Sequence, residues 1–161
     1  TVSISFCYLR MKSGMTPLFS GDDIKRWFDH FQDRAEEKIL KLLMAGGEKF
    51  VAIARKSGSY DDQTGNLRSS IGYVIAKDGE VIISNFKESN KGSDKSTGKE
   101  KGHRVAEDIS LSFSGGYILV GVAGMDYAAA VEAKGYEVVT GANTLCNKYL
   151  KKALFSVFKK M

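Results

Sequence analysis

The chain has 161 residues, of which 43% are hydrophobic, 27% charged and 11% aromatic. This length and composition exclude a wholly disordered chain and predict one globular domain with its own hydrophobic core. The net charge is +5, because 24 Lys and Arg residues are nearly balanced by 19 Asp and Glu, so binding to a polyanion is permitted but not indicated. The two cysteines are too few for a disulfide framework, and no apolar stretch is long enough to span a membrane, so we expect a reduced, intracellular protein.

A long amphipathic helix is predicted near the start of the chain. Apolar residues recur at helical spacing from Ile24 to Ala54, and charged residues occupy the opposite face. Asp22 or Asp23 is expected to cap this helix, which would end near Lys56. Two consecutive glycines inside it are expected to weaken or bend it.

A β-hairpin follows a polar segment that is rich in turn-forming residues. Residues 67–76 alternate as a strand does, and residues 81–86 form the returning strand. Asp78-Gly79 between them is a strong signal for a two-residue hairpin turn.

Residues 87–102 differ from the rest of the chain because they contain no apolar side chain. Such a segment buries too little surface to offset its ordering entropy, so we expect a mobile insertion loop. The region after residue 86 also carries four of the five net positive charges. A solvated loop is one reading, and contact with DNA or a partner through its lysines is the other, with the candidates Lys91, Lys95, Lys99 and Lys101.

The last part of the chain alternates strand and helix signals. A buried strand is expected over residues 117–123, a short helix over residues 127–134 and a short strand over residues 136–140. A final amphipathic helix follows, with Thr144 as the expected cap.

The predicted fold class is therefore α+β. A long N-terminal amphipathic helix and a C-terminal helix are expected to pack on one antiparallel β-sheet, both on the same face. We expect this single domain to occupy residues 21–161, preceded by an extension or arm of residues 1–20.

The residue patterns offer little for catalysis. His30, His103 and Cys146 stand in no local signature for a nucleophile and base, and Asp61-Asp62 lies among turn formers. We therefore expect no enzyme activity, no metal and no cofactor.

Two motifs resemble a known family. Residues 62–73 read Asp-Gln-Thr-Gly-Asn-Leu-Arg-Ser-Ser-Ile-Gly-Tyr, and residues 122–138 read Val-Ala-Gly-Met-Asp-Tyr-Ala-Ala-Ala-Val-Glu-Ala-Lys-Gly-Tyr-Glu-Val. In this order, after a long amphipathic helix, they resemble the head–tail joining or tail-completion (neck, minor tail) proteins of tailed bacteriophages. The resemblance covers residues 22–158.

The resemblance implies a structural virion component, encoded by a phage or prophage, that forms rings, commonly hexameric, between the capsid connector and the tail tube. It implies location at the virion neck or tail, with assembly in the bacterial cytoplasm, and transient passage of DNA through the ring. It leaves open the head or tail side of the joint and the subunit count. The alternative is a small basic nucleic-acid-binding protein of a mobile element.

Four motif residues are candidates for packing or intersubunit contacts. Arg68 is expected to project from the sheet on the face opposite Leu67. The alternative is that each candidate organises only its own monomer. The candidates are Arg68, Tyr127, Glu132 and Tyr136.

Overall fold

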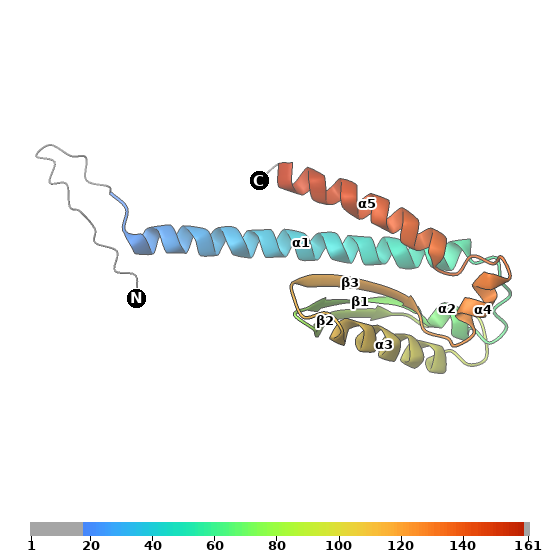
Figure 1. The fold of residues 1–161 in the computed structure, drawn as a ribbon. Coiled ribbons are helices and arrows are strands. Elements are labelled where there is room, and N and C mark those ends of the chain that lie inside the picture. The colour runs from blue at the N-terminus through green and yellow to red at the C-terminus, as the bar shows by residue number, and fades with distance from the viewer. Residues whose placement is uncertain (1–17, 160–161) are drawn as a thin grey trace, which may run out of the picture. The chain divides into compact units, whose positions relative to one another are not determined.

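The structure, a computed structural model, describes residues 18–159, whose arrangement is drawn in Figure 1. The chain divides into two compact units between Glu36 and Glu37. The expected arm at residues 1–20 lies outside the described residues, apart from residues 18–20. The elements in chain order are α1 (Gly21–Ser57), α2 (Asn66–Ser69), β1 (Ile71–Lys77), β2 (Glu80–Phe86), α3 (Ser96–Leu111), β3 (Tyr117–Ala123), α4 (Ala128–Ala133) and α5 (Thr140–Lys159).

Ser20, which precedes α1, caps the start of this helix. The Ser20 hydroxyl accepts the Asp23 backbone N–H at 3.2 Å, and the Asp23 carboxylate accepts the Ser20 N–H at 2.8 Å. This reciprocal pair is a capping box, so the prediction of Asp22 or Asp23 as the cap was wrong. Asp23 instead takes the third helical position, where its charge also suits the helix dipole.

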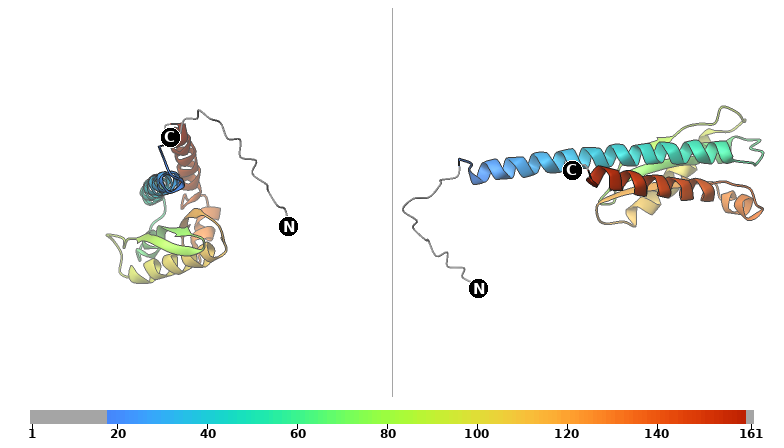
Figure 2. Two further views of the ribbon diagram at one scale, coloured as in Figure 1. Left: turned by 90° about the vertical axis from the view of Figure 1, so that its left-hand side faces the viewer. Right: turned by 90° about the horizontal axis from the view of Figure 1, so that it is seen from above.

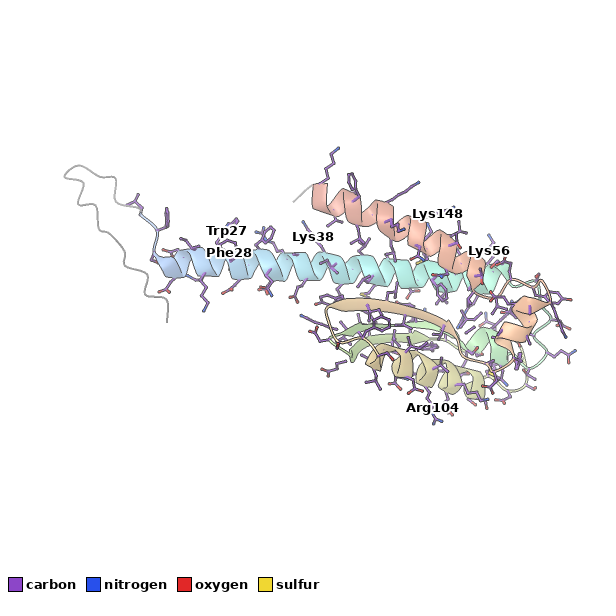
Figure 3. The ribbon with its side chains drawn as sticks, in the orientation of Figure 1. Trp27, Phe28, Lys38, Lys56, Arg104 and Lys148 are labelled. Carbon is purple, nitrogen blue, oxygen red and sulfur yellow. The ribbon has the colours of Figure 1, made fainter. Side chains whose placement is uncertain are left out.

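The first turns of α1 carry large apolar side chains that are exposed. Trp27 and Phe28 are 59% and 58% exposed and stand out from the helix in Figure 3, while Ile24 and Phe31 are 44% and 39% exposed. The Trp27 ring meets Phe28 edge-on at 5.3 Å and stacks on Phe31 at 6.0 Å between centroids. We call the three aromatic residues, together with the neighbouring Ile24, the aromatic stripe.

The sheet has three strands in the order β2-β1-β3, and both pairings are antiparallel. The predicted hairpin is confirmed, because Asp78 and Gly79 connect β1 and β2 with φ of 53° and 87°. Two successive positive φ values suit the right-handed twist of the flanking strands. The central strand β1 is buried along almost its whole length, whereas β2 alternates between exposed and half-buried residues up to the buried Phe86 at its end.

Residues 37–57 of α1 and helix α5 cover one face of the sheet, as Figures 1 and 2 show. The fold class is thus as predicted: the long N-terminal helix and the C-terminal helix pack on one antiparallel sheet. The core on this face contains Phe50, Leu67, Ile71 and Val138.

The glycine pair in α1 serves this packing, and α1 runs through both residues. A Cβ on Gly47 would lie 2.5 Å from the Tyr73 ring, and one on Gly46 would lie 2.6 Å from the Leu150 side chain. These glycines allow close approach of the helix to the sheet and to α5.

Helix α3 covers the opposite face of the sheet, which corrects the expectation of helices on one face only (Figure 1). The core there contains Val74, Phe86, Ala106, Val120 and Val122. Since both faces of β1 are covered, its even-numbered residues are as deeply buried as its odd-numbered ones.

The expected mobile loop at residues 87–102 was therefore wrong over its second half, because α3 begins at Ser96. The buried face of α3 consists of small residues four apart: Gly98, Gly102, Ala106 and Ser110. Residues four apart lie on one side of a helix, so this stripe lets the α3 backbone approach the strands closely without large apolar side chains.

Two further expectations near the C-terminus fail. Residues 136–140 form no strand, and α5 begins at Thr140 rather than after Thr144. The short helix is close to its predicted place, at Ala128–Ala133. No helix within residues 18–159 has the length and apolarity needed to cross a bilayer.

Candidate functional site

The two motifs lie together at one end of the sheet. Their residues Leu67, Ile71, Ala128 and Val138 belong to one core cluster. A shallow hollow of about 210 Å³ also lies between the two motifs, lined by residues 60–64, Leu67, Tyr127 and Val131. Segments about 60 positions apart in the sequence thus build one corner of the molecule.

The corner is ordered by the carboxylate of Asp62. One of its oxygens accepts the Gly65 N–H at 3.1 Å, and the other accepts the Arg68 N–H at 2.9 Å. Gly65 has φ of 81°, a left-handed conformation that favours glycine, and this bend turns the chain into the single turn α2. Asp61-Asp62 is thus part of a turn, as expected from its neighbours.

Asn66 joins this corner to the start of α3. Its side-chain oxygen accepts the Gly98 N–H at 2.8 Å, in a buried position, and its side-chain NH₂ donates to Asp94 at 3.2 Å. The hydrogen bond holds the pKa of Asp94 below its ordinary value. Asn66 therefore satisfies a backbone donor in the first turn of α3, which has no intrahelical acceptor.

Glu132 likewise accepts backbone N–H groups at the start of α5. Its Oε1 accepts the N–H groups of Val139 at 2.8 Å and Thr140 at 2.7 Å, while Glu137 accepts the Gly141 N–H at 3.1 Å. Burial by itself would raise the pKa of Glu132, but these backbone hydrogen bonds outweigh it and leave the pKa below its ordinary value. Glu132 thus holds the start of α5 by hydrogen bonds within its own chain.

The remaining motif candidates are placed differently. Arg68 lies in α2 and not on the sheet, so its expected projection from a strand was wrong. Tyr127 precedes α4 and is 42% exposed, and Tyr136 is 44% exposed after α4. Burial raises the pKa of Tyr127, because the rest of its side chain packs into the corner.

The four candidate lysines do not share one loop. Lys91 precedes α3, Lys95 is its N-cap, and Lys99 and Lys101 lie within it. Lys101 pairs with Asp126 at 2.7 Å, an exposed contact that lowers the pKa of Asp126.

Beside the corner lies a polar cavity of about 430 Å³, lined by Arg55, Tyr60 and Arg68 among others. Arg55 donates from Nη2 to the carbonyl oxygens of Ile71 at 2.9 Å and Lys87 at 2.5 Å. Arg68 donates from Nη2 to the Gly58 carbonyl at 3.4 Å, and its guanidinium carbon lies 5.6 Å from the Tyr60 ring centroid. We call this the Arg55–Arg68 cavity.

Three polar atoms of residues that line this cavity are buried away from its open space and have no geometric hydrogen-bond partner: Arg55 Nε, Tyr60 Oη and Arg68 Nε. Burial raises the pKa of Tyr60 to about 12, although the nearby Arg68 guanidinium opposes the increase. Burial also lowers the pKa of Arg55. Within residues 18–159, neither arginine forms an ion pair with a carboxylate.

Sequence reasoning missed Arg55, Tyr60 and Asn66. Arg55 belongs to the polar face of α1 in the helical pattern, and Tyr60 stands alone among turn formers. The available signal was Asn66 inside the first motif, since Asn is a common capping residue, but its target at Gly98 is 32 positions away.

Cys146 and His103, two of the residues considered for catalysis, have other partners. The buried Cys146 thiol donates to the Gly46 carbonyl at 3.2 Å, and burial raises its pKa. His103 contacts Glu107 at 3.2 Å and lies against the Phe86 ring. The described part of the chain contains no group of three or more His, Cys, Asp or Glu residues placed to hold a metal ion.

Comparison of the chain with protein-family models, curated proteins and solved structures found no match.

Proposed function

We infer that this chain is a structural subunit of a tailed phage or prophage that joins head to tail, as a tail-completion or tail-terminator-like protein, and that it assembles with copies of itself into a ring. Its further partners would be the connector and tail-tube proteins. The identity of the assembly rests on the resemblance of the two motifs. The assembly itself rests on one structural observation, the aromatic stripe.

The aromatic stripe supports self-association on energetic grounds. Contiguous exposed apolar side chains mark interaction surfaces, and aromatic residues are enriched at the buried centres of interfaces. Trp27 and Phe28, each more than half exposed, would lose water contact in an interface. Ring closure needs an interface between two different patches of the same chain, so the stripe of one copy would pack on another patch of the next.

Passage of DNA is compatible with the surface charge. Lys91 and Lys99 are exposed, and lysines facing a channel would attract phosphates at low salt. Since Lys101 already pairs with Asp126, the cationic surface is smaller than the sequence suggests.

The test is sedimentation velocity over a concentration series, with negative-stain imaging of the largest species. We expect concentration-dependent oligomers and rings for the wild type, and monomers with unchanged helical circular dichroism for a Trp27→Ser, Phe28→Ser double variant. Lys25→Ser, Asp29→Ser on the same turns is the matched control and should assemble normally. A wild-type chain that stays monomeric and fails to join purified heads to tails would refute the proposal.

A further inference from the structure

The outer edge of β3 carries backbone groups that no strand pairs with. Within residues 18–159, β3 is the last strand of the sheet on its side, because the strand order is β2-β1-β3. The Gly124 N–H, just past the end of β3, donates to the Ser70 carbonyl, just before β1, at 3.3 Å. Hydrogen-bonded pairs alternate along an antiparallel ladder, so the even-numbered residues of β3 bond to β1. The odd-numbered residues, among them Leu119 and Gly121, direct their N–H and C=O groups away from the sheet.

The two edges of the sheet differ in how far they are protected against pairing. Gly121, in the middle of β3, is exposed and has no side chain, so the exposed surface there belongs to the backbone. Strand β3 also contains no charged residue and no proline, the devices that usually protect an edge strand. Strand β2 has such devices, since it begins with Glu80 and its register with β1 shifts between Ile75 and Ala76, as at a bulge. Of the two edges, β3 is the one suited to accept a strand.

The edge of β3 lies in a groove with two chemically different sides. The groove has a volume of about 430 Å³, and β3 contributes residues 118–121 to its lining. Helix α3 contributes the exposed apolar side chains of Ile109 and Phe113, whereas α5 contributes polar side chains that include Asn143 and Thr144. Helices α3 and α5 cover opposite faces of the sheet (Figure 1). A strand added at this edge would therefore have an apolar neighbour on one face and a polar neighbour on the other. We call this groove the β3 groove.

The chain itself contains a segment whose pattern matches the β3 groove. In residues 2–8, large apolar residues alternate with small polar ones: Val2, Ile4, Phe6 and Tyr8 alternate with Ser3, Ser5 and Cys7. Successive side chains of a strand point to opposite faces, so this segment paired as a strand would have one apolar and one polar face. The segment has the same length as β3, and like β3 it contains no charge and no proline.

We propose that the outer edge of β3 binds residues 2–8 of a second copy of this chain as a fourth strand, with the apolar face of that strand against α3 and its polar face against α5. Main-chain hydrogen bonds to residues such as Leu119 and Gly121 hold it, as in other cases of strand addition. Residues 9–20 link the segment to α1 and can span about 40 Å when extended, which allows it to reach a neighbouring copy. The inference rests on the proposed self-assembly, because so short a strand binds weakly unless a neighbouring copy holds it close.

The test is disulfide cross-linking in the full chain. Cys7 belongs to the polar side of the alternating pattern, so Asn143→Cys or Thr144→Cys should form a disulfide with Cys7 of another copy under mild oxidation. Non-reducing gels should show a covalent dimer for at least one variant, and mass spectrometry should identify the linked peptides. The buried Cys146 should stay reduced.

Lys152→Cys is the matched control, because it is exposed on α5 about 12 Å beyond Thr144 along the helix. A disulfide needs Cα atoms within about 7 Å, so this variant should link to Cys7 at least about fivefold less. Equal linkage in all three variants would overturn the proposal. A Cys7 link that forms only within one chain would also overturn it.

A second measurement does not depend on the register of the added strand. Ile4→Asp, Phe6→Asp places two charges on the face that meets Ile109 and Phe113, so sedimentation velocity should show self-association weakened by about tenfold or more. Ser3→Thr, Ser5→Thr keeps the alternation and should assemble as the wild type does. Equal assembly of the two double variants would overturn the proposal.

Failure of strand exchange and failure of the proposed function give different results. Rings that form without any Cys7 link in the Asn143→Cys and Thr144→Cys variants would overturn strand exchange alone. A Cys7 link between copies of a chain that forms no ring would support strand exchange and overturn ring assembly.

Discussion

The two faces of the sheet are covered by helices that pack in different ways. On one face, α1 and α5 contribute large apolar side chains such as Phe50 and Leu150, whose shapes can adjust. On the other face, α3 contributes small residues, and its backbone lies against the backbone of Asn66 and Ser70. A contact between side chains can relax by changing rotamers, whereas a contact between backbones cannot. The α3 face should therefore tolerate less change.

The largest effect is expected for Gly98→Ala. The added Cβ would lie less than 3.0 Å from the backbone oxygen of Asn66, and a backbone atom cannot turn aside as the end of a side chain can. We expect a loss of about 3 kcal/mol or more in the free energy of unfolding, although Ala is the better helix former. Urea denaturation followed by circular dichroism measures it. Gly115→Ala, which meets no atom within 4 Å, should change stability by less than about 0.5 kcal/mol.

The second largest effect is expected for Asn66→Ala, which tests how the start of α3 is held. Asn66→Ala removes the acceptor of the buried Gly98 N–H at the first turn of α3. An unpartnered buried donor costs about 1–3 kcal/mol, so we expect a loss of about 2 kcal/mol in urea denaturation. Asn147→Ala, which loses an exposed contact within α5, is the control and should cost less than about 0.5 kcal/mol. Equal losses in the two variants would contradict a special role for Asn66.

A smaller effect is expected for Glu132→Gln at the start of α5. The amide oxygen still accepts hydrogen bonds, but the charge opposite the helix dipole is lost, so we expect a loss of about 1 kcal/mol at pH 7. Because the folded pKa of Glu132 is lowered, its contribution is present above the unfolded value of about 4.5 and disappears as the pH falls through the folded pKa. Wild type and variant should therefore converge in thermal unfolding at low pH. A difference that persists there would exclude the charge as its cause.

The smallest effect is expected for Gly46→Ala, the counterpart of Gly98→Ala on the other face. Its Cβ would meet the half-buried Leu150 side chain, which can shift, and the helix gains up to about 1 kcal/mol in propensity. We expect a net change below about 1 kcal/mol by urea denaturation. A loss as large as that of Gly98→Ala would remove the proposed difference between the two faces.

The same difference explains which elements were predictable. Large apolar residues at helical spacing identify α1, and the Asp78-Gly79 dipeptide identifies the hairpin, because both signals are local in the sequence. Helix α3 carries its signal in Gly98, Gly102, Ala106 and Ser110, which hydrophobic periodicity does not register. Its first seven residues, 96–102, were accordingly predicted as loop, since a stripe of small residues stabilises a helix only when a closely fitting surface is present.

The candidate site, too, was predictable only in part. The two motifs and the candidates Arg68 and Glu132 are visible in the sequence, but the partners of these residues are set by tertiary contacts. Asn66 reaches Gly98 across 32 positions, and Arg55 reaches the carbonyl oxygen of Lys87 across the same number.

The sequence by itself determined the α+β class and a small positive charge, most of it after residue 86. Both follow from composition and local periodicity, which do not depend on contacts between distant segments. Only the tertiary structure decided that residues 96–102 form a helix, that Lys101 is paired, and that Arg55, Tyr60 and Arg68 surround one cavity. These features depend on contacts between segments that are far apart in the chain. The sequence around each residue does not indicate such contacts, because they arise only when the chain is folded.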